Sequence, residues 1–181
     1  MLKDLLFNLI VCTALQNTPR LYTGGKQELS LCTYVLKEID LIIEMISKIL
    51  VAIDGSKHAD KAFEYASDLA KKAKARLLII HVLEELGNIG YSIAKELELR
   101  DREMLQKYQS RAKRLVTDTY VDAVEAKGND VAEEILHTAD KENIDTIVVG
   151  SRGISEAKEF LLGSVSYKVS HYAKCPVIIV R

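Results

Sequence analysis

The sequence predicts a doubly wound α/β domain, in which helices cover both faces of a five-stranded parallel sheet. From Lys48 onward, short apolar runs alternate with longer segments whose apolar residues recur at helical spacing. The apolar runs are nearly continuous, which is typical of strands covered on both faces. Short connections between strands and helices favour right-handed crossovers, and these make neighbouring strands parallel.

Five segments have the composition of strands. They are Ile49–Ile53, Leu77–Val82, Tyr120–Ala126, Thr146–Val149 and Val177–Val180. The first ends at Asp54-Gly55-Ser56, and Pro176 leads into the last. The third is less apolar than the others, so we expect it nearer an edge of the sheet.

Four segments with apolar stripes separate these strands and predict helices. The first follows Ser56, and the third begins after Asp130, a residue type that caps helices well. In the long second helix, from about Ile93 to Val116, the residues expected to be buried are Leu97, Met104, Leu105, Tyr108, Ala112 and Leu115. In the last helix they are Val165, Val169, Tyr172 and Ala173.

Composition and charge argue against several classes of partner. With 181 residues, 48% of them hydrophobic and 28% charged, the chain suits one soluble domain with a possible appendage. A net charge of −1 provides no field that attracts nucleic acid or an anionic membrane. Cys12, Cys32 and Cys175 form neither a C-x-x-C pair nor a zinc spacing, which fits a reducing compartment and a cytoplasmic location.

Residues 1–46 fall outside the alternating pattern. Their first apolar core, Leu5 to Leu15, is interrupted by Asn8 and is too short to span a bilayer. Met45 stands three residues before Lys48, where the pattern begins. We expect Met45 to be the true start and the upstream part to be an over-extended reading frame. A helical appendage covering an apolar surface and a membrane-targeting segment are the alternatives. The predicted domain is residues 47–181.

A glycine-rich stretch follows the fourth predicted strand. Gly150, Gly153 and Gly163 are spaced G-x2-G-x9-G, and Ser164 and Ser166 follow at the predicted start of a helix. Glycines let a ligand approach the main chain closely, and a helix N-terminus offers free N–H groups that suit a phosphate. The stretch therefore has the form of half a nucleotide site, although three glycines in such a loop can also serve tight turning alone.

A second set of residues identifies a family resemblance. K-I-L-V-A-I-D-G-S at Lys48–Ser56, L-L-I-I-H-V at Leu77–Val82 and C-P-V-I-I-V at Cys175–Val180, together with the glycine stretch, resemble the universal stress protein family. The glycine spacing followed by Ser or Thr resembles the ATP-binding branch of that family. The resemblance covers about residues 47–181. It implies the strand order 3-2-1-4-5, which would set Asp54 opposite Gly150 to Gly153.

The resemblance also implies a set of nucleotide-binding residues. They are Ala52, Ile53 and Asp54 toward the adenosine, the backbone of Val82 toward the adenine edge, Gly150, Arg152 and Gly153 around the ribose and phosphates, and Gly163, Ser164, Val165 and Ser166 around the phosphates. Mg²⁺ or Mn²⁺ would bridge the phosphate oxygens. From the residues alone, Asp54 and Ser164 could each be a helix N-cap, and Arg152 could be a solvated surface arginine.

Three functions fit these observations. The first is an ATP-binding regulatory protein of the stress response, which forms a homodimer through its C-terminal strand and signals to a possible protein partner. The second is a slow ATP hydrolase or nucleotide-transferring enzyme of the adenine-nucleotide α-hydrolase-like group. The third is a nucleotide-free interaction module. No Ser–His–Asp arrangement, paired site carboxylates or Walker-type motif is evident, so we expect no catalytic residue. We also expect no dedicated metal site, because the histidines are scattered and His81 lies inside an apolar strand.

Truncation at Met45 tests the predicted domain boundary. A chain that begins at Met45 should unfold cooperatively and bind nucleotide as the full chain does, because the alternating pattern starts only at Lys48. Thermal melts followed by circular dichroism provide the measurement. Aggregation, or a large fall in melting temperature, would show instead that the upstream residues cover apolar surface.

Overall fold

The computed structural model describes residue 43 and residues 45–84, 91–154 and 162–181. The chain divides into two units, and only the second, Ile42–Arg181, holds described residues. The expectations for residues 1–42, and for the loop of residues 85–90, lie outside the described residues. Within the described segments, no helix has the length and apolarity needed to cross a membrane.

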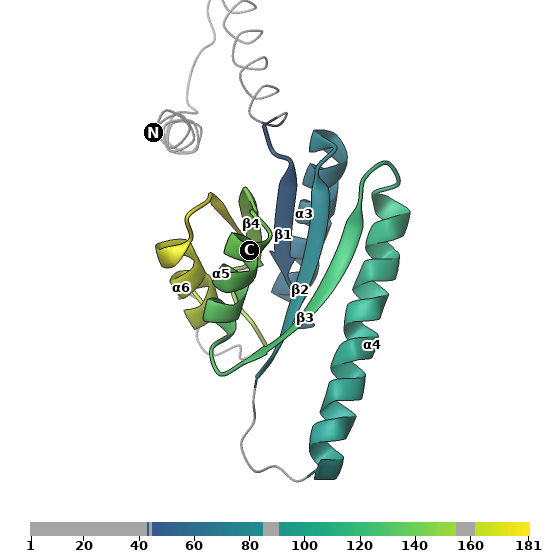
Figure 1. The fold of residues 1–181 in the computed structure, drawn as a ribbon, viewed down its shortest axis with the longest axis vertical. Coiled ribbons are helices and arrows are strands. Elements are labelled where there is room, and N and C mark those ends of the chain that lie inside the picture. Colours follow the sequence, from purple (N-terminus) through teal and green to yellow (C-terminus); the bar gives the residue numbers. More distant parts are fainter. Residues whose placement is uncertain (1–42, 44, 85–90, 155–161) are drawn as a thin grey trace, which may run out of the picture. The chain divides into compact units, whose positions relative to one another are not determined.

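A five-stranded parallel sheet forms the centre of the domain (Figure 1). Its strands are β1 (Lys48–Ala52), β2 (Arg76–Glu84), β3 (Val121–Gly128), β4 (Thr146–Gly150) and β5 (Val177–Val180). Its helices are α3 (Lys57–Ala73), α4 (Tyr91–Leu115), α5 (Val131–Lys141) and α6 (Ser164–Tyr172). The strand order is β3-β2-β1-β4-β5, so the order expected from the resemblance and the edge position of β3 are both confirmed.

Strand β1 lies where the strand order reverses. It pairs with β2 on one side, with Val51 opposite Ile79, and with β4 on the other, with Val51 opposite Val148. The chain therefore builds β1, β2 and β3 in one direction and then crosses back to place β4 and β5 on the far side of β1. In open parallel sheets a crevice forms beyond the carboxyl ends of the strands at such a point.

The two faces of the sheet bury separate apolar clusters. Ile49 and Val51 of β1 belong to the cluster under α3 and α4, which is built around Phe63. Leu50, between them, points to the opposite face and packs in the cluster under α5 and α6, together with Ile135. Successive strand side chains point to opposite faces, so a strand covered on both sides needs apolar residues at every position.

Side-chain hydrogen bonds determine where α3 and α5 begin. The Ser56 hydroxyl accepts from the Ala59 amide at 3.1 Å and begins α3, and Lys74 in the left-handed region, with φ of 52°, ends it. The Asp130 carboxylate accepts from the Ala132 amide at 2.9 Å and begins α5, as the sequence predicted.

Two of the side chains expected to be buried are exposed. Leu115 is 43% exposed and Tyr172 is 65% exposed. In both helices the buried stripe continues with a step of four residues, from Ala112 to Val116 and from Val169 to Ala173. Leu115 and Tyr172 stand one residue earlier and fall beside the stripe. The phenol of Tyr172 can meet solvent there.

Gly150 is predicted to have a packing role that can be measured. A Cβ at this position would lie 2.8 Å from the carbonyl carbon of His58 and 2.9 Å from its oxygen, both main-chain atoms of α3. Gly150→Ala should therefore lower the free energy of unfolding by about 1–3 kcal/mol, the usual cost of overpacking. Urea denaturation measures this change.

Gly128→Ala is the matched control for that substitution. The three atoms nearest to a Cβ on Gly128 all belong to the Glu134 side chain, the closest at 2.6 Å, and a flexible side chain can move aside. Its effect should stay within about 0.5 kcal/mol, as for most surface substitutions. Equal losses for the two variants would contradict the packing role of Gly150.

Candidate functional site

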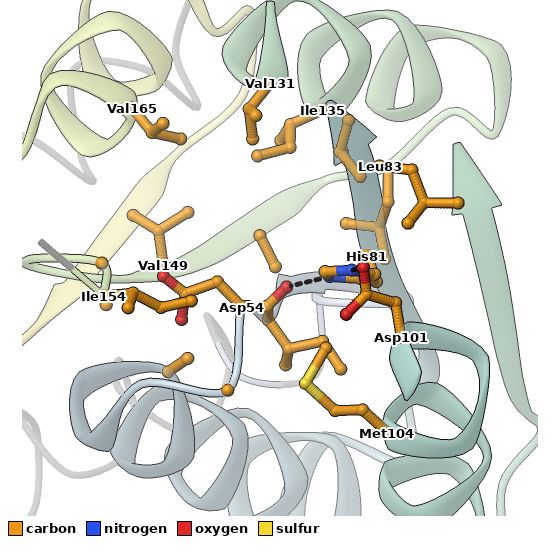
Figure 2. Close-up of a pocket in the computed structure, with 18 of the residues that line it drawn as sticks. Asp54, His81, Leu83, Asp101, Met104, Val131, Ile135, Val149, Ile154 and Val165 are labelled. Atoms are coloured by element: carbon orange, nitrogen blue, oxygen red, sulfur yellow. Dashed lines mark hydrogen bonds and ion pairs between the residues drawn. The ribbon is translucent and has the colours of Figure 1, made fainter. Parts of the chain in front are cut away.

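A cavity of about 1240 Å³ lies at the carboxyl ends of β1, β2 and β4. Residues of α4, of the loop after β4 and of the start of α6 complete its walls (Figure 2). The residues singled out by the sequence all line it: Ala52, Ile53, Asp54, Val82, Gly150, Arg152, Gly153, Gly163, Ser164, Val165 and Ser166. The fold thus brings together three segments that are far apart in the chain.

Asp54 lines this cavity and lies between Ile154 and His81 in the view of Figure 2. Its Oδ1 accepts from the Ser56 amide at 2.9 Å, while Ser56 itself is the N-cap of α3. The alternative that Asp54 caps the helix is therefore wrong. Its Oδ2 lies only 2.6 Å from the position that a Cβ on Gly153 would take. Because Gly153 has no side chain, the Asp54 carboxylate can occupy this space.

The loop after β4 is fastened to the start of α3. The Ser56 hydroxyl donates to the main-chain oxygen of Arg152 at 3.5 Å, across 96 residues of sequence. Arg152 is half-buried, which argues against a fully solvated surface arginine. The loop backbone is therefore held against the end of β1, where Asp54 lies.

Gly163 serves close packing rather than an unusual backbone conformation. Its φ is −63°, which any residue adopts. A Cβ there would approach the Ser151 carbonyl oxygen and the Arg152 Cα at 3.3 Å, and the Gly163 amide donates to that same oxygen at 2.9 Å. Gly163 thus packs directly against Ser151 and Arg152, immediately before α6 begins.

The start of α6 presents main-chain amides without a side-chain cap. Its N-cap is Gly163, not Ser164, so no side chain accepts from the first turn. An α-helix leaves its first N–H groups without intrahelical partners, and here these belong to Ser164, Val165 and Ser166. The Ser166 hydroxyl donates to the Gly150 carbonyl at 2.6 Å and is buried. This hydrogen bond anchors α6 to β4.

Helix α4 supplies a wall that reasoning from the sequence missed. Leu97, Asp101 and Met104 stand at i, i+4 and i+7 and all line the cavity. The signal that could have identified this wall is the acidic residue Asp101 on an otherwise apolar stripe.

At the surface, Lys127 of β3 donates to Glu98 of α4 at 2.6 Å, and this hydrogen bond lowers the pKa of the Glu98 carboxyl.

His81 also lines the cavity, beside Asp101 (Figure 2). It was expected to be a hydrogen-bonded core histidine, and it is 7% exposed with Nδ1 2.9 Å from the Ile53 carbonyl oxygen. Its Nε2 is buried, lies 3.6 Å from Asp101 Oδ2 and has no hydrogen-bond partner in the part of the chain that the structure describes.

The arrangement is suited to holding an anionic ligand that carries a flat apolar ring. Main-chain amides lie at the start of α6, and apolar side chains such as Val131, Ile135 and Met104 line other parts of the cavity beside the charged ones (Figure 2). Among the described residues, no three His, Cys, Asp or Glu side chains are grouped to hold a metal ion.

Comparisons with known proteins place this geometry in a family. The model of the universal stress protein family matches residues 45–181. Universal stress protein YxiE of Bacillus subtilis is 40% identical over 151 residues, which cover 76% of this chain and all of that protein. A universal stress protein solved in complex with cAMP is 25% identical with a TM-score of 0.60, over 75% of this chain and 97% of that chain. One from Archaeoglobus fulgidus, in complex with dAMP, is 22% identical with a TM-score of 0.59, over 75% and 98%, and shares the fold.

Proposed function

This chain belongs to the universal stress protein family, and we propose that it is an ATP-binding regulatory member that acts as a homodimer. One observation supports nucleotide binding best: the uncapped amides at the start of α6 and the carboxylate of Asp54 lie on one cavity. The first suits phosphates and the second suits a ribose hydroxyl, so the pair fits the two polar parts of a nucleotide.

The phosphates would lie against the first turn of α6. The N–H groups of Ser164, Val165 and Ser166 carry the positive end of the helix dipole, and Gly163 contributes no side chain in front of them. Hydrogen bonds from amides to a charged oxygen are about twice as strong as neutral ones. Gly150, Arg152 and Gly153 would border the ribose and phosphates from the loop after β4.

The adenosine would occupy the β1 and β2 side of the cavity. Ala52 and Ile53 line it just before Asp54, whose carboxylate would accept from a ribose hydroxyl. The backbone of Val82, at the carboxyl end of β2, would meet the adenine edge. The relative solved with cAMP supports an adenine nucleotide as the ligand class in this fold.

A divalent cation would enter with the phosphates. Mg²⁺ keeps several waters and is usually held through one or two carboxylates and the phosphates of the ligand itself. Because the Asp54 carboxylate is assigned to a ribose hydroxyl, Mg²⁺ or Mn²⁺ would be bound through the phosphates and water rather than by a dedicated protein ligand.

Binding without committed chemistry fits the histidine–carboxylate pair, His81 and Asp101, that lines the cavity. In a hydrolytic triad, one ring nitrogen faces the carboxylate and the other faces the nucleophile. In His81, Nε2 faces Asp101 and Nδ1 is bonded to the Ile53 carbonyl oxygen. Nε2 thus faces a carboxylate rather than a hydroxyl or thiol, so the pair does not have the order of a triad, and we propose nucleotide binding and regulation through a protein partner.

A cytoplasmic location is part of the proposal. Cys175 carries a free thiol, which fits a reducing compartment. Burial raises the pKa of this thiol to about 11, so it is an inert packing residue rather than a reactive one.

Replacing Ser164 by proline tests the amide donors of α6. Proline is favoured at the first position of a helix, and the extended backbone of Gly163, with ψ of 151°, is the conformation that precedes proline. The variant should keep its stability but lose one N–H toward the phosphates. We expect Mg-ATP to bind about 10- to 100-fold more weakly, as measured by titration calorimetry.

Ser164→Ala is the matched control, because it removes the hydroxyl and keeps the amide. Its affinity for Mg-ATP should stay close to that of the unmodified chain. Equal affinity of the proline and alanine variants, both with unchanged melts, would remove the start of α6 from the site.

The proposed dimer would pair through the open edge of β5. The carbonyls of Pro176 and Val180 accept from the β4 side, so the alternation of the strand turns the main-chain groups of Ile179 outward. An exposed apolar edge strand is a ready template for pairing with a second copy.

Ile179→Pro tests this edge. Light scattering should give twice the mass of one chain for the unmodified protein and the mass of one chain for the variant, because proline removes the outward N–H. Ile179→Ala shortens the side chain but keeps the N–H, and should remain dimeric. An unmodified chain that is monomeric at every concentration would contradict the dimer.

A further inference from the structure

We propose that Met104 is an oxidation site, and that conversion of its thioether to the sulfoxide weakens nucleotide binding. The chain holds three methionines, Met1, Met45 and Met104. Met104 belongs to α4 and lines the same cavity as Asp54. The effect on binding rests on the proposed nucleotide site, whereas the reaction of the sulfur itself does not depend on that site.

The Met104 sulfur packs against the turn that joins β1 to α3. Its Sδ lies 2.9 Å from the position that a Cβ on Gly55 would take. Gly55 has a φ of 81°, in the left-handed region that favours glycine, and the preceding residue is Asp54. Figure 2 shows the Met104 side chain extending from α4 toward Asp54. A chemical change at this sulfur therefore takes place beside the proposed ribose contact.

A small oxidant can reach the Met104 side chain through the cavity. The side chain is half-buried: it lines the cavity and also packs against the apolar cluster around Phe63. We assign hydrogen peroxide as the oxidant. A sulfur lone pair attacks one peroxide oxygen and the O–O bond breaks. The proton of the transferred oxygen passes to the other oxygen, which leaves as water. The thioether is thus oxidised by two electrons to a sulfoxide, and the peroxide is reduced.

The added oxygen has no favourable position when the nucleotide is bound. The Gly55 side leaves no room even for a Cβ. Toward the cluster around Phe63 the oxygen would meet apolar side chains, where an unbonded polar group is unfavourable. Toward the cavity it would occupy ligand volume and would bring a further acceptor beside the carboxylate of Asp54. Oxidation of Met104 therefore opposes nucleotide binding.

Peroxide treatment followed by titration with Mg-ATP tests this proposal. Peptide mass spectrometry should find one added oxygen on Met104, and titration calorimetry should show an affinity for Mg-ATP at least about tenfold lower than before treatment. Saturating Mg-ATP during treatment should slow the oxidation of Met104. It should not slow that of Met45, which is 46% exposed and does not line the cavity.

Met104→Leu is the decisive variant, because leucine is apolar, has a similar volume and carries no oxidisable sulfur. Peroxide should leave its affinity for Mg-ATP at the value that the same variant has before treatment. Met45→Leu is the matched control and should lose affinity on treatment as the unmodified chain does. Met104→Gln introduces a polar group without peroxide and should bind Mg-ATP more weakly, and it replaces the leucine variant if that variant does not fold.

Three results would overturn this proposal alone. They are a Met104 that stays unoxidised while Met45 reacts, an oxidised Met104 with unchanged affinity for Mg-ATP, and an equal loss of affinity in treated Met104→Leu, which would place the damage at another residue. An untreated chain that binds no Mg-ATP would instead overturn nucleotide binding, and the effect of Met104 on it as well.

Discussion

The pairing of β1 with β4 is the contact on which the candidate site depends. These strands are about a hundred residues apart in sequence, yet Leu50 lies opposite Ile147 and Val51 opposite Val148. Their carboxyl ends therefore deliver Asp54 and the glycine loop to one point. The Ser56 hydroxyl donates to the Arg152 carbonyl, and Gly153 packs against the Asp54 carboxylate. These contacts join the loop after β4 to the segment after β1.

Glycines and small residues allow these segments to come close enough. Gly150 lets the backbone of β4 touch the first turn of α3, and Gly163 lets the chain return onto the Ser151 and Arg152 backbone. The buried Ser166 hydroxyl ties α6 back to β4. The glycines that would let a phosphate approach the backbone thus also let neighbouring segments of the chain pack closely.

Much of the fold could be predicted from the sequence, since strands covered on both faces and amphipathic helices leave strong periodic signals. The strand order required the family resemblance, because periodicity carries no information on which strands pair. Within the site, Asp54 and Gly153 could be identified because each lies in a short motif that carries the family resemblance. Asp101 could not, because its contact with His81 depends on where α4 lies against β2. Tyr172 was misassigned because periodicity alone does not separate the centre of a buried stripe from its margin.

The central claim is that the cavity between Asp54 and the start of α6 holds an adenine nucleotide. Mass spectrometry of the small molecules released when the gently purified protein is denatured tests it most directly. The account predicts that an adenine nucleotide is released, in an amount comparable with that of the protein chain. Protein that releases no nucleotide, and takes none up when Mg-ATP is added before the measurement, would contradict it and favour the nucleotide-free interaction module.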